Sequence, residues 1–153
     1  MPESLLEQLL GLPHLTITGH ELPNATTVIL DIKPTLQVAL CPQCGHPSAD
    51  LHDYDDPRLV RDLSLWGRHC FLRLRGRRFE CAQCRQAFTE RLEWVEFNSS
   101  QTRRYEAYIF ELCRKNTPQY VSQLEDLGYD AVESIFLRLG KKQSNRDNSG
   151  ASG

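Results

Sequence analysis

The chain has 153 residues, of which 40% are hydrophobic and 25% are charged, and its formal net charge is -2. These values are typical of a soluble folded protein with one ordinary domain or two small ones, and they exclude collagen-like and broadly disordered chains. The apolar runs are only a few residues long, so we expect no membrane-spanning segment. The acidic, amphipathic N-terminus lacks the charged start and apolar core of a secretory signal, which predicts a reducing cytoplasm.

The basic charge is concentrated in one part of the chain. Nine arginines and three carboxylates give residues 58–91 a charge of +6, whereas residues 41–57 carry -4. Residues 1–40 carry -3 and residues 92–153 carry -1. The nearly neutral total therefore hides a cationic central segment.

Residues 1–40 are predicted to form a short helix and a β segment. Ser4 is a suitable N-cap, and the leucine spacing indicates a helix over residues 4–10. β-Branched residues between turn residues then predict strands, which span 14–18, 26–33 and 35–40. We expect this region to form a small antiparallel sheet that packs on the domain that follows.

Residues 41–97 are predicted to form a separate domain of turns and strands. The segment RHCFLRLRGRRF, residues 68–79, alternates between apolar and basic side chains, which is typical of a half-exposed strand. One face carries Cys70, Leu72 and Leu74, and the other carries Phe71, Arg73 and Arg75. We expect the outer face of this strand to be cationic.

Residues 98–142 are predicted to form three helices. The apolar stripe within residues 101–115 indicates an amphipathic helix capped by a serine, and Thr117-Pro118 predicts the cap and first position of a short second helix. A third helix is expected over residues 130–139, ending at Gly140. Residues 143–153 contain a single apolar residue and are predicted to be a disordered tail.

Two CxxC pairs are the first group with recognisable chemistry. Cys41 and Cys44 precede Cys81 and Cys84, with 36 residues between the pairs. Two such turns can complete a tetrahedral Cys₄ site suited to structural Zn²⁺, which leaves no coordination position open for catalysis. A thioredoxin-like redox pair, a [4Fe–4S] cluster and unrelated buried cysteines are the alternatives.

The arginines are the second group. Guanidinium groups bind phosphates through paired hydrogen bonds and stack on bases, which indicates contact with nucleic acid. The alternative is a solvated strand face neutralised by the acidic residues of 50–56. The candidate DNA contacts in this region are Arg58, Arg61, Arg68, Arg73, Arg75, Arg77 and Arg78.

The three predicted helices are the third group. A short second helix, a glycine-containing turn and a third helix match a helix-turn-helix, in which the last helix lies in the major groove. A plain three-helix packing unit is the alternative. The candidate contacts here are Arg103, Arg104, Ser134, Arg138, Lys141 and Lys142. The predicted fold class is thus α+β: a small antiparallel sheet with a Cys₄ zinc ribbon, followed by a three-helix unit.

Several motifs together resemble the N-terminal part of ISL-three-type insertion-sequence transposases. They are the CPQCG knuckle at 41–45, a His-Asp-Tyr turn, an R-x-x-R-D-L-x-x-x-G segment at 58–67, a basic strand running into R-R-F-x-C-x-x-C, and FTER. The resemblance covers about residues 5–142. A motif of several parts is far more specific than two CxxC pairs alone.

This resemblance implies a zinc finger and a helix-turn-helix that recognise the terminal inverted repeats of a transposon. Full-length members continue into a DDE catalytic domain that binds two Mg²⁺ ions and carries out strand cleavage and transfer. No residue of this chain is assigned to that acidic triad, so we expect a non-catalytic product of a truncated or frameshifted gene. The expected partner is double-stranded DNA in the nucleoid, with the full-length transposase or a second copy of the chain as further partners.

A zinc-stabilised module that binds protein is the competing hypothesis. Such a module would regulate the full-length transposase through an exposed apolar surface. It predicts that Trp66, Trp94 and Phe97 face the solvent rather than the core.

Overall fold

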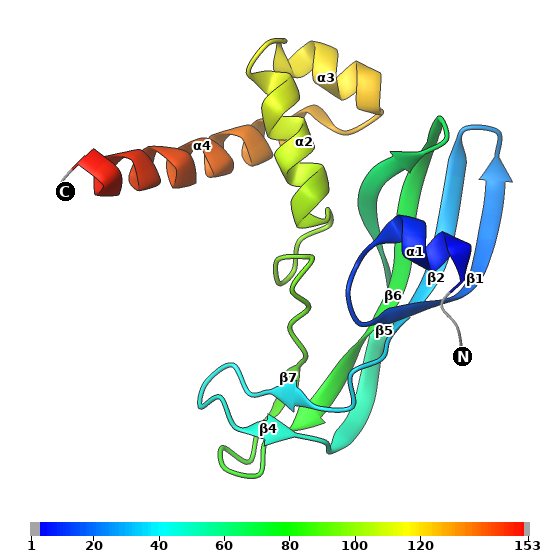
Figure 1. Ribbon diagram of the computed structural model, residues 1–153, viewed down its shortest axis with the longest axis vertical. Coiled ribbons are helices and arrows are strands. Elements are labelled where there is room, and N and C mark those ends of the chain that lie inside the picture. The colour runs from blue at the N-terminus through cyan, green and yellow to red at the C-terminus, as the bar shows by residue number, and fades with distance from the viewer. Residues whose placement is uncertain (1–3, 152–153) are drawn as a thin grey trace. The chain divides into compact units, whose positions relative to one another are not determined.

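The computed structural model describes residues 4–151, with side chains described through residue 147. It has two compact units that divide between Thr102 and Arg103. The first unit is rich in strands and the second is helical, as Figure 1 shows. This mixed composition confirms the predicted α+β class. No helix within residues 4–151 is both long and apolar enough to cross a membrane.

The first unit begins with the predicted short helix, α1 (Leu5–Leu10). The Ser4 side chain accepts a hydrogen bond from the Glu7 backbone N–H, and the Glu7 carboxylate accepts one from the Ser4 N–H in return, which is a capping box. Glu7 also accepts hydrogen bonds of 2.7 Å each from the Ile17 N–H and the Thr16 hydroxyl. These two donors lower the pKa of the Glu7 carboxyl. One side chain thus caps the helix and attaches it to the sheet.

A mixed sheet follows, in the order β1-β2-β6-β5, with β7 paired to β6. Its strands are β1 (Leu15–Asn24), β2 (Thr27–Pro34), β5 (Leu51–Leu65), β6 (Arg68–Glu80) and β7 (Ala87–Thr89). The pairs are antiparallel except β2 with β6, which is parallel. The segment 35–40 forms only the two-residue β3 (Ala39–Leu40), because the chain leaves the sheet after Pro34.

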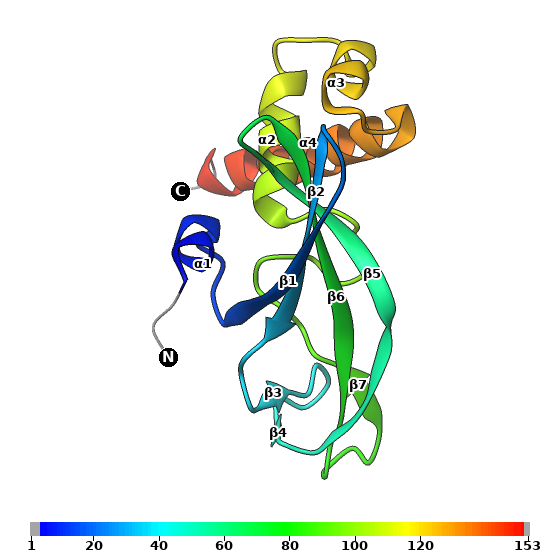
Figure 2. The ribbon, with the colours of Figure 1, turned by 90° about the vertical axis from the view of Figure 1, so that its right-hand side faces the viewer.

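One face of this sheet carries the core of the unit. The strands contribute Leu30, Val60 and Leu72, each no more than 2% exposed. Leu10 of α1 packs against them, as do Trp94 and Val95 of the segment after β7. Figure 2 shows α1 beside β1 on this unit. The zinc-binding segments lie beyond this core, at the end of the β5–β6 hairpin remote from its turn.

The expected alternation along β6 holds only as far as Arg75. Leu72 and Leu74 are buried, but beyond Gly76 the buried residues are Arg77 and Phe79. An irregularity in β5 between Tyr54 and Pro57 lies opposite this change of phase. A Cβ atom on Gly76 would lie 2.7 Å from a carboxylate oxygen of Asp55 and 3.1 Å from the Thr89 methyl group, so a larger residue would require these side chains to shift. Arg77 therefore points into the protein, and the expected uniformly cationic outer face is wrong at this position.

The second unit contains three helices, α2 (Arg103–Cys113), α3 (Pro118–Glu125) and α4 (Tyr129–Ala151). The Thr117 side chain accepts a hydrogen bond of 3.2 Å from the Tyr120 N–H, which confirms the predicted cap of α3. The three helices share a core whose members are at most 1% exposed: Tyr105, Ile109, Val121, Val132 and Ile135.

Helix α4 does not end at Gly140. It continues to Ala151, so the predicted stop is wrong, and residues 143–151 of the expected disordered tail are helical. A glycine inside a helix costs only about 1 kcal/mol relative to alanine. No proline follows Gly140 to interrupt the backbone hydrogen bonds. Residues 152–153 of the expected tail lie outside the described part of the chain.

Residues 98–102, at the end of the first unit, run beside β5 and form hydrogen bonds with it. The Arg61 N–H donates to the Ser100 carbonyl at 2.8 Å, and the Thr102 N–H donates to the Arg61 carbonyl at 2.9 Å. The Thr102 hydroxyl also donates to the Asp62 carboxylate at 2.8 Å. Helix α2 therefore begins at Arg103 rather than at residue 101, because the two preceding residues already bond to the sheet.

Candidate metal centre and nucleic-acid interface

Two hairpins each hold one CxxC knuckle. Cys41 and Cys44 lie between β3 and β4 (Pro47–Ser48), and Cys81 and Cys84 lie between β6 and β7. Both turns make the same pair of backbone hydrogen bonds. In the first knuckle, the Gly45 N–H donates to the Cys41 carbonyl (2.8 Å) and the Cys41 N–H donates to the His46 carbonyl (3.0 Å). In the second, the Arg85 N–H donates to the Cys81 carbonyl (2.7 Å) and the Cys81 N–H donates to the Gln86 carbonyl (3.0 Å). The buried Ser48 hydroxyl donates to the Glu80 carbonyl at 2.6 Å and joins the two hairpins.

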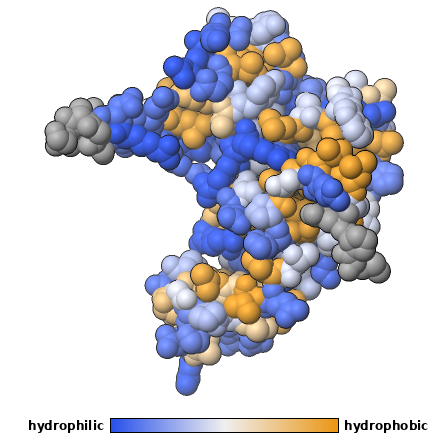
Figure 3. Space-filling model, viewed as in Figure 1, coloured by the Kyte–Doolittle hydropathy of each residue, from blue (hydrophilic) through white to orange (hydrophobic). Residues whose placement is uncertain are grey.

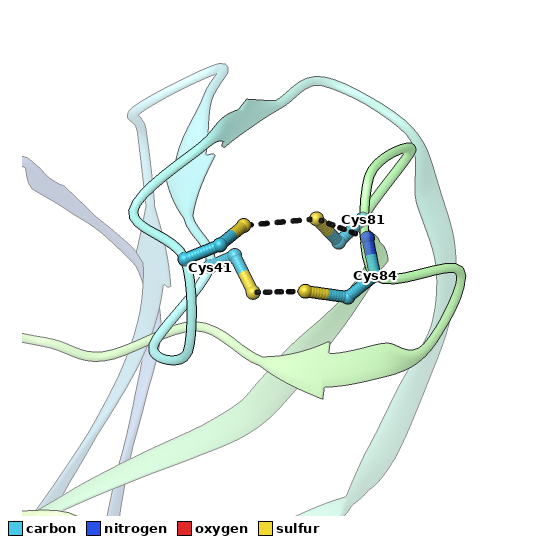
Figure 4. Close-up of side chains that lie close together, drawn as sticks. Cys41, Cys81 and Cys84 are labelled. Atoms are coloured by element: carbon cyan, nitrogen blue, oxygen red, sulfur yellow. Dashed lines mark hydrogen bonds between the residues drawn. The ribbon is translucent and has the colours of Figure 1, made fainter.

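The four sulfur atoms converge, all within 4.8 Å of one another. The Cys41 and Cys84 sulfurs are 3.9 Å apart, and those of Cys44 and Cys81 are 3.6 Å apart. Figure 4 shows Cys41, Cys81 and Cys84 pointing into the same space. A zinc ion with four bonds of about 2.3 Å to sulfur holds its ligands about 3.8 Å apart. The spacing of these cysteines therefore fits a tetrahedral zinc site.

The pKa values of the Cys41 and Cys84 thiols are shifted in opposite directions. Hydrogen bonds from the backbone N–H groups of Cys44 and Gln43 hold the pKa of the Cys41 thiol at about 7. A hydrogen bond with Cys44, together with burial and the neighbouring thiols, raises the pKa of Cys84 to about 12. Four thiolates at this spacing repel one another unless a cation lies between them. A zinc ion held by the four cysteines would supply that charge and link the two hairpins.

The alternatives for the cysteines fit less well. The short sulfur contacts run between the two knuckles, whereas a redox disulfide forms within one CxxC pair. A four-iron cluster would hold its four thiolates farther apart, because the cluster occupies the centre. Cys70 and Cys113 are buried in the two units and do not belong to the sulfur cluster, as expected. The sequence prediction of a structural Zn²⁺ site is confirmed.

The two knuckles differ at the residue after the second cysteine. Gly45 has a φ of 74°, and Arg85 occupies the equivalent position with a φ of 57°. Left-handed backbone costs a non-glycine residue roughly 1–2 kcal/mol. We expect Arg85→Gly to raise the free energy of unfolding by up to about 1 kcal/mol and Gly45→Ala to lower it by about the same amount. Paired thermal unfolding curves at saturating zinc test this, and a stabilising Gly45→Ala would contradict it.

Two of the arginines predicted to contact DNA are buried. Arg77 is 7% exposed and pairs with the Glu90 carboxylate through hydrogen bonds of 2.6 and 2.7 Å. This bond to Glu90 raises the pKa of Arg77. Arg61 is 3% exposed, lies over the Phe71 ring and places a guanidinium nitrogen 2.8 Å from His69 Nδ1. These two side chains stabilise the fold, so we withdraw them from the proposed DNA contacts.

Three further arginines are half-buried and hold strands or loops together. Arg73 bonds to Asp31 at 2.6 Å and to Glu21 at 3.0 Å, and both carboxylates raise its pKa. Arg58 donates to the Ser99 carbonyl at 2.7 Å. Arg68 donates to the Asn24 carbonyl at 2.7 Å. Sequence reasoning missed these roles because every partner lies far away in the chain.

Arg75 and Arg78 are the more exposed arginines of β6. Arg75 lies 5.5 Å from the centre of the Tyr54 ring and donates to a backbone carbonyl. The Arg78 side chain is 43% exposed and lies 3.6 Å from Asp53. The acidic segment 50–56 thus partly neutralises this strand, as the alternative interpretation expected, and the cationic surface is smaller than the composition indicates.

Buried carboxylates fix the helices of the second unit. Glu106 on α2 is 2% exposed and forms an ion pair with Arg138 on α4. Glu125 on α3 accepts hydrogen bonds from the Tyr105 hydroxyl at 2.9 Å and the Tyr108 hydroxyl at 3.2 Å. Sequence reasoning missed both glutamates. The sequence does contain a signal for Glu106. The buried Ile109 and Cys113 follow it by three and seven residues, so Glu106 lies on the same face of the helix as these two core residues.

A hollow on α4 gathers four of the predicted contact residues. It is lined by Asp130, Glu133, Ser134, Leu137, Arg138, Lys141 and Lys142. Figure 3 shows hydrophilic residues on α4 next to the end that is drawn in grey. Of the other two predicted contacts, both on α2, Arg103 is exposed and Arg104 is half-buried. Arg138 is fixed by Glu106, so it positions α4, whereas Ser134, Lys141 and Lys142 are exposed.

Comparisons with known proteins find two family models that match consecutive segments of the chain. Residues 37–84 match the family model for the zinc-finger of transposase IS204/IS1001/IS1096/IS1165. Residues 90–140 match the helix-turn-helix domain of transposase family ISL3. The chain is 29% identical over 137 residues to the transposase for insertion sequence element IS1001 of Bordetella parapertussis. That alignment covers 88% of this chain and 34% of the relative, so the chain spans about a third of the relative's length. No solved structure matches the chain. Two consecutive segments of the chain therefore match the zinc finger and the helix-turn-helix domain of insertion-sequence transposases, and together they span residues 37–140 except for 85–89.

Proposed function

We propose that this chain binds double-stranded DNA and that its specific target is the terminal inverted repeat of an insertion sequence. One observation carries the proposal: α4 is held against α2 by the ion pair of Arg138 with the buried Glu106, and α4 presents Ser134, Lys141 and Lys142 to the solvent. In a helix-turn-helix the last helix enters the major groove, where short polar side chains contact base edges and lysines contact phosphates.

The roles within this site follow from exposure. Ser134 and its neighbours on α4 contact bases, while Lys141 and Lys142 contact the phosphate backbone. Arg103 on α2 adds a further phosphate contact. The first unit has its own candidate phosphate contacts, Arg75 and Arg78 on β6. The zinc ion has a structural role, because four cysteines fill its coordination sphere. We assign no catalytic residue to this chain.

The double variant Lys141→Ala/Lys142→Ala tests the phosphate contacts. We expect it to weaken binding on every DNA sequence and to reduce the slope of log K against log[salt] by about 1–2, because each neutralised phosphate releases about 0.9 counterion. Gel shifts with inverted-repeat and shuffled duplexes, over a range of salt concentrations, measure both quantities. Ser134→Ala should instead reduce the preference for the inverted repeat without changing the slope.

Arg114→Ala provides the matched control. Arg114 follows α2 and lies 3.3 Å from Glu111. Like the two lysines it is exposed, but it does not line the hollow on α4. Its removal should leave affinity and slope within experimental error. Salt-insensitive binding by the intact chain, or no binding to either duplex, would contradict the proposal.

The competing hypothesis of a protein-binding module receives less support. Trp94 is 6% exposed and belongs to the core, so it cannot serve as a surface anchor. Phe97 is exposed, but the Arg91 guanidinium lies over its ring at 3.6 Å from the centre. Of the three expected anchors, only Trp66 presents an uncovered aromatic surface. Cross-linking of the chain to intact transposase, without any shift of DNA, would favour this hypothesis.

A further inference from the structure

Trp66 is a large apolar side chain that is exposed to the solvent. It is 80% exposed, whereas the other tryptophan, Trp94, is 6% exposed. It lies at the turn of the β5–β6 hairpin, beside the turn of the β1–β2 hairpin (Figure 1). This end of the sheet is opposite the zinc-binding end. Neither the zinc site nor the sheet core uses this side chain.

The backbone at Trp66 is of a kind that tryptophan seldom adopts. Leu65 pairs with Arg68, so Trp66 and Gly67 form a two-residue turn, and their φ values are 47° and 77°. A turn with positive φ at both positions is type I′, for which asparagine and aspartate are the usual residues before glycine. Tryptophan therefore costs stability here and gains no packing in return. Strain without a structural benefit points to a function.

The turn is held rigidly. The Arg68 guanidinium donates to the Asn24 carbonyl at 2.7 Å and the Thr27 carbonyl at 3.2 Å, which ties the two hairpins together. The His69 N–H donates to the Thr26 carbonyl at 2.8 Å, extending the parallel pairing of β2 and β6 to the tip. Trp66 is thus presented on a scaffold that loses little conformational entropy when the indole is buried by a partner.

The charge around the tip suits a polyanion. Residues 63–69 and 22–27, which form the ends of the two hairpins, contain Arg68 and His69 and no carboxylate. Elsewhere on the sheet, Arg73 is paired with Asp31 and Arg78 with Asp53. An exposed aromatic side chain can stack on bases or insert between base steps, and a neighbouring cation without a nearby acid does not oppose the approach of phosphates.

We propose that Trp66 is a DNA-contacting residue, whose indole inserts against a base step of the bound duplex while Arg68 holds the hairpin tips in place. This inference rests on the proposed DNA binding and assigns the contact to the first unit, in addition to α4. Apolar side chains on rigid elements unstack base steps in this way and bend the duplex. The contact is aromatic, so it depends on the deformability of the step rather than on phosphate charge.

The variant Trp66→Asn separates this role from folding. Asparagine is favoured in a type I′ turn, so the melting temperature should stay equal or rise, while affinity for the inverted-repeat duplex falls about 10-fold or more, as expected for a lost stacking contact. The slope against salt should not change, unlike that of the lysine variant on α4. Trp66→Phe keeps an aromatic ring and should lose less than about 3-fold. Leu36→Asn, at an exposed leucine in the segment before the first knuckle, is the matched control.

Acrylamide quenching of tryptophan fluorescence provides a direct readout. In the free chain most quenching should come from Trp66, and inverted-repeat DNA should protect it; Trp66→Phe, in which only the buried Trp94 remains, should show no such change.

If the intact chain binds DNA while Trp66→Asn binds equally well and Trp66 stays open to acrylamide, this inference is wrong and the proposed function survives. If Trp66→Asn abolishes self-association in sedimentation but leaves DNA affinity intact, Trp66 contacts protein and the inference is likewise overturned. Absence of DNA binding by the intact chain overturns both.

Discussion

Removal of zinc is expected to unfold the knuckle end of the first unit while its sheet stays folded. Strands β3 and β4 have two residues each and cannot persist alone, so the hairpins depend on the metal. The sheet has its own core of Leu30, Val60 and Leu72 packed against α1. Hydrogen exchange with and without chelator should show protection lost at residues 39–50 and 81–89 and kept in the centres of β2 and β6. Loss of protection throughout the sheet would contradict this expectation.

Cysteine variants identify the ligands independently of the chelator. Cys81→Ser should reduce bound zinc from about one ion per chain to none and reproduce the exchange pattern of the metal-free chain. Cys113→Ala is the matched control, because Cys113 is as well buried as Cys41 but lies in the helical unit. It should keep its zinc. Metal analysis that finds no zinc in the intact chain, with both knuckles protected, would rule out the site.

Arg77→Ala is expected to lower the free energy of unfolding of the first unit by about 3–5 kcal/mol, because it leaves the buried Glu90 carboxylate without its partner. The Arg77 and Glu90 side chains are only 9% and 6% exposed. Arg77 also donates to the Leu36 carbonyl at 2.6 Å, which would lose a hydrogen bond as well. Chemical denaturation at saturating zinc measures the change.

The neighbouring Arg78 is the control for that experiment. Its ion pair with Asp53 spans 3.6 Å between side chains that are 43% and 51% exposed. Arg78→Ala should therefore cost less than about 1 kcal/mol. If the two variants destabilise the unit equally, burial does not distinguish these arginines. Arg77→Lys should remain destabilising, because an ammonium group cannot form the paired bonds to Glu90.

Local signals in the sequence predicted the features that depend on neighbouring residues. The caps at Ser4 and Thr117 were correct, because each satisfies backbone N–H groups within one turn. The zinc site was also predictable, because metal geometry demands thiolates in a fixed spacing. The long interval between the knuckles is filled by the β5–β6 hairpin, as the strand patterns between them indicated.

Features that depend on distant residues were not predictable. The alternation in β6 gave no sign of the change of phase at Gly76, which lies opposite the irregularity in β5 between Tyr54 and Pro57. Arg77 and Arg61 looked like surface cations, because composition does not show which carboxylate or ring lies beside them after folding. The stop expected at Gly140 failed for a related reason: the glycine lies against Phe110 of α2, in a helix that continues.

The parallel pairing of β2 with β6 bears on the order in which the first unit folds. Thr27 pairs with His69 and Asp31 with Arg73, so this contact must close a loop of about forty residues. Cys44 lies inside that loop and Cys81 lies just after it, and a zinc ion would join the two. With the knuckles joined, the path along the chain from β2 to β6 shortens to roughly half, through the metal rather than through β5. A zinc ion bound before these strands pair would thus lower the entropic cost of their pairing, so we expect the metal to speed assembly of the sheet as well as to stabilise the knuckle end.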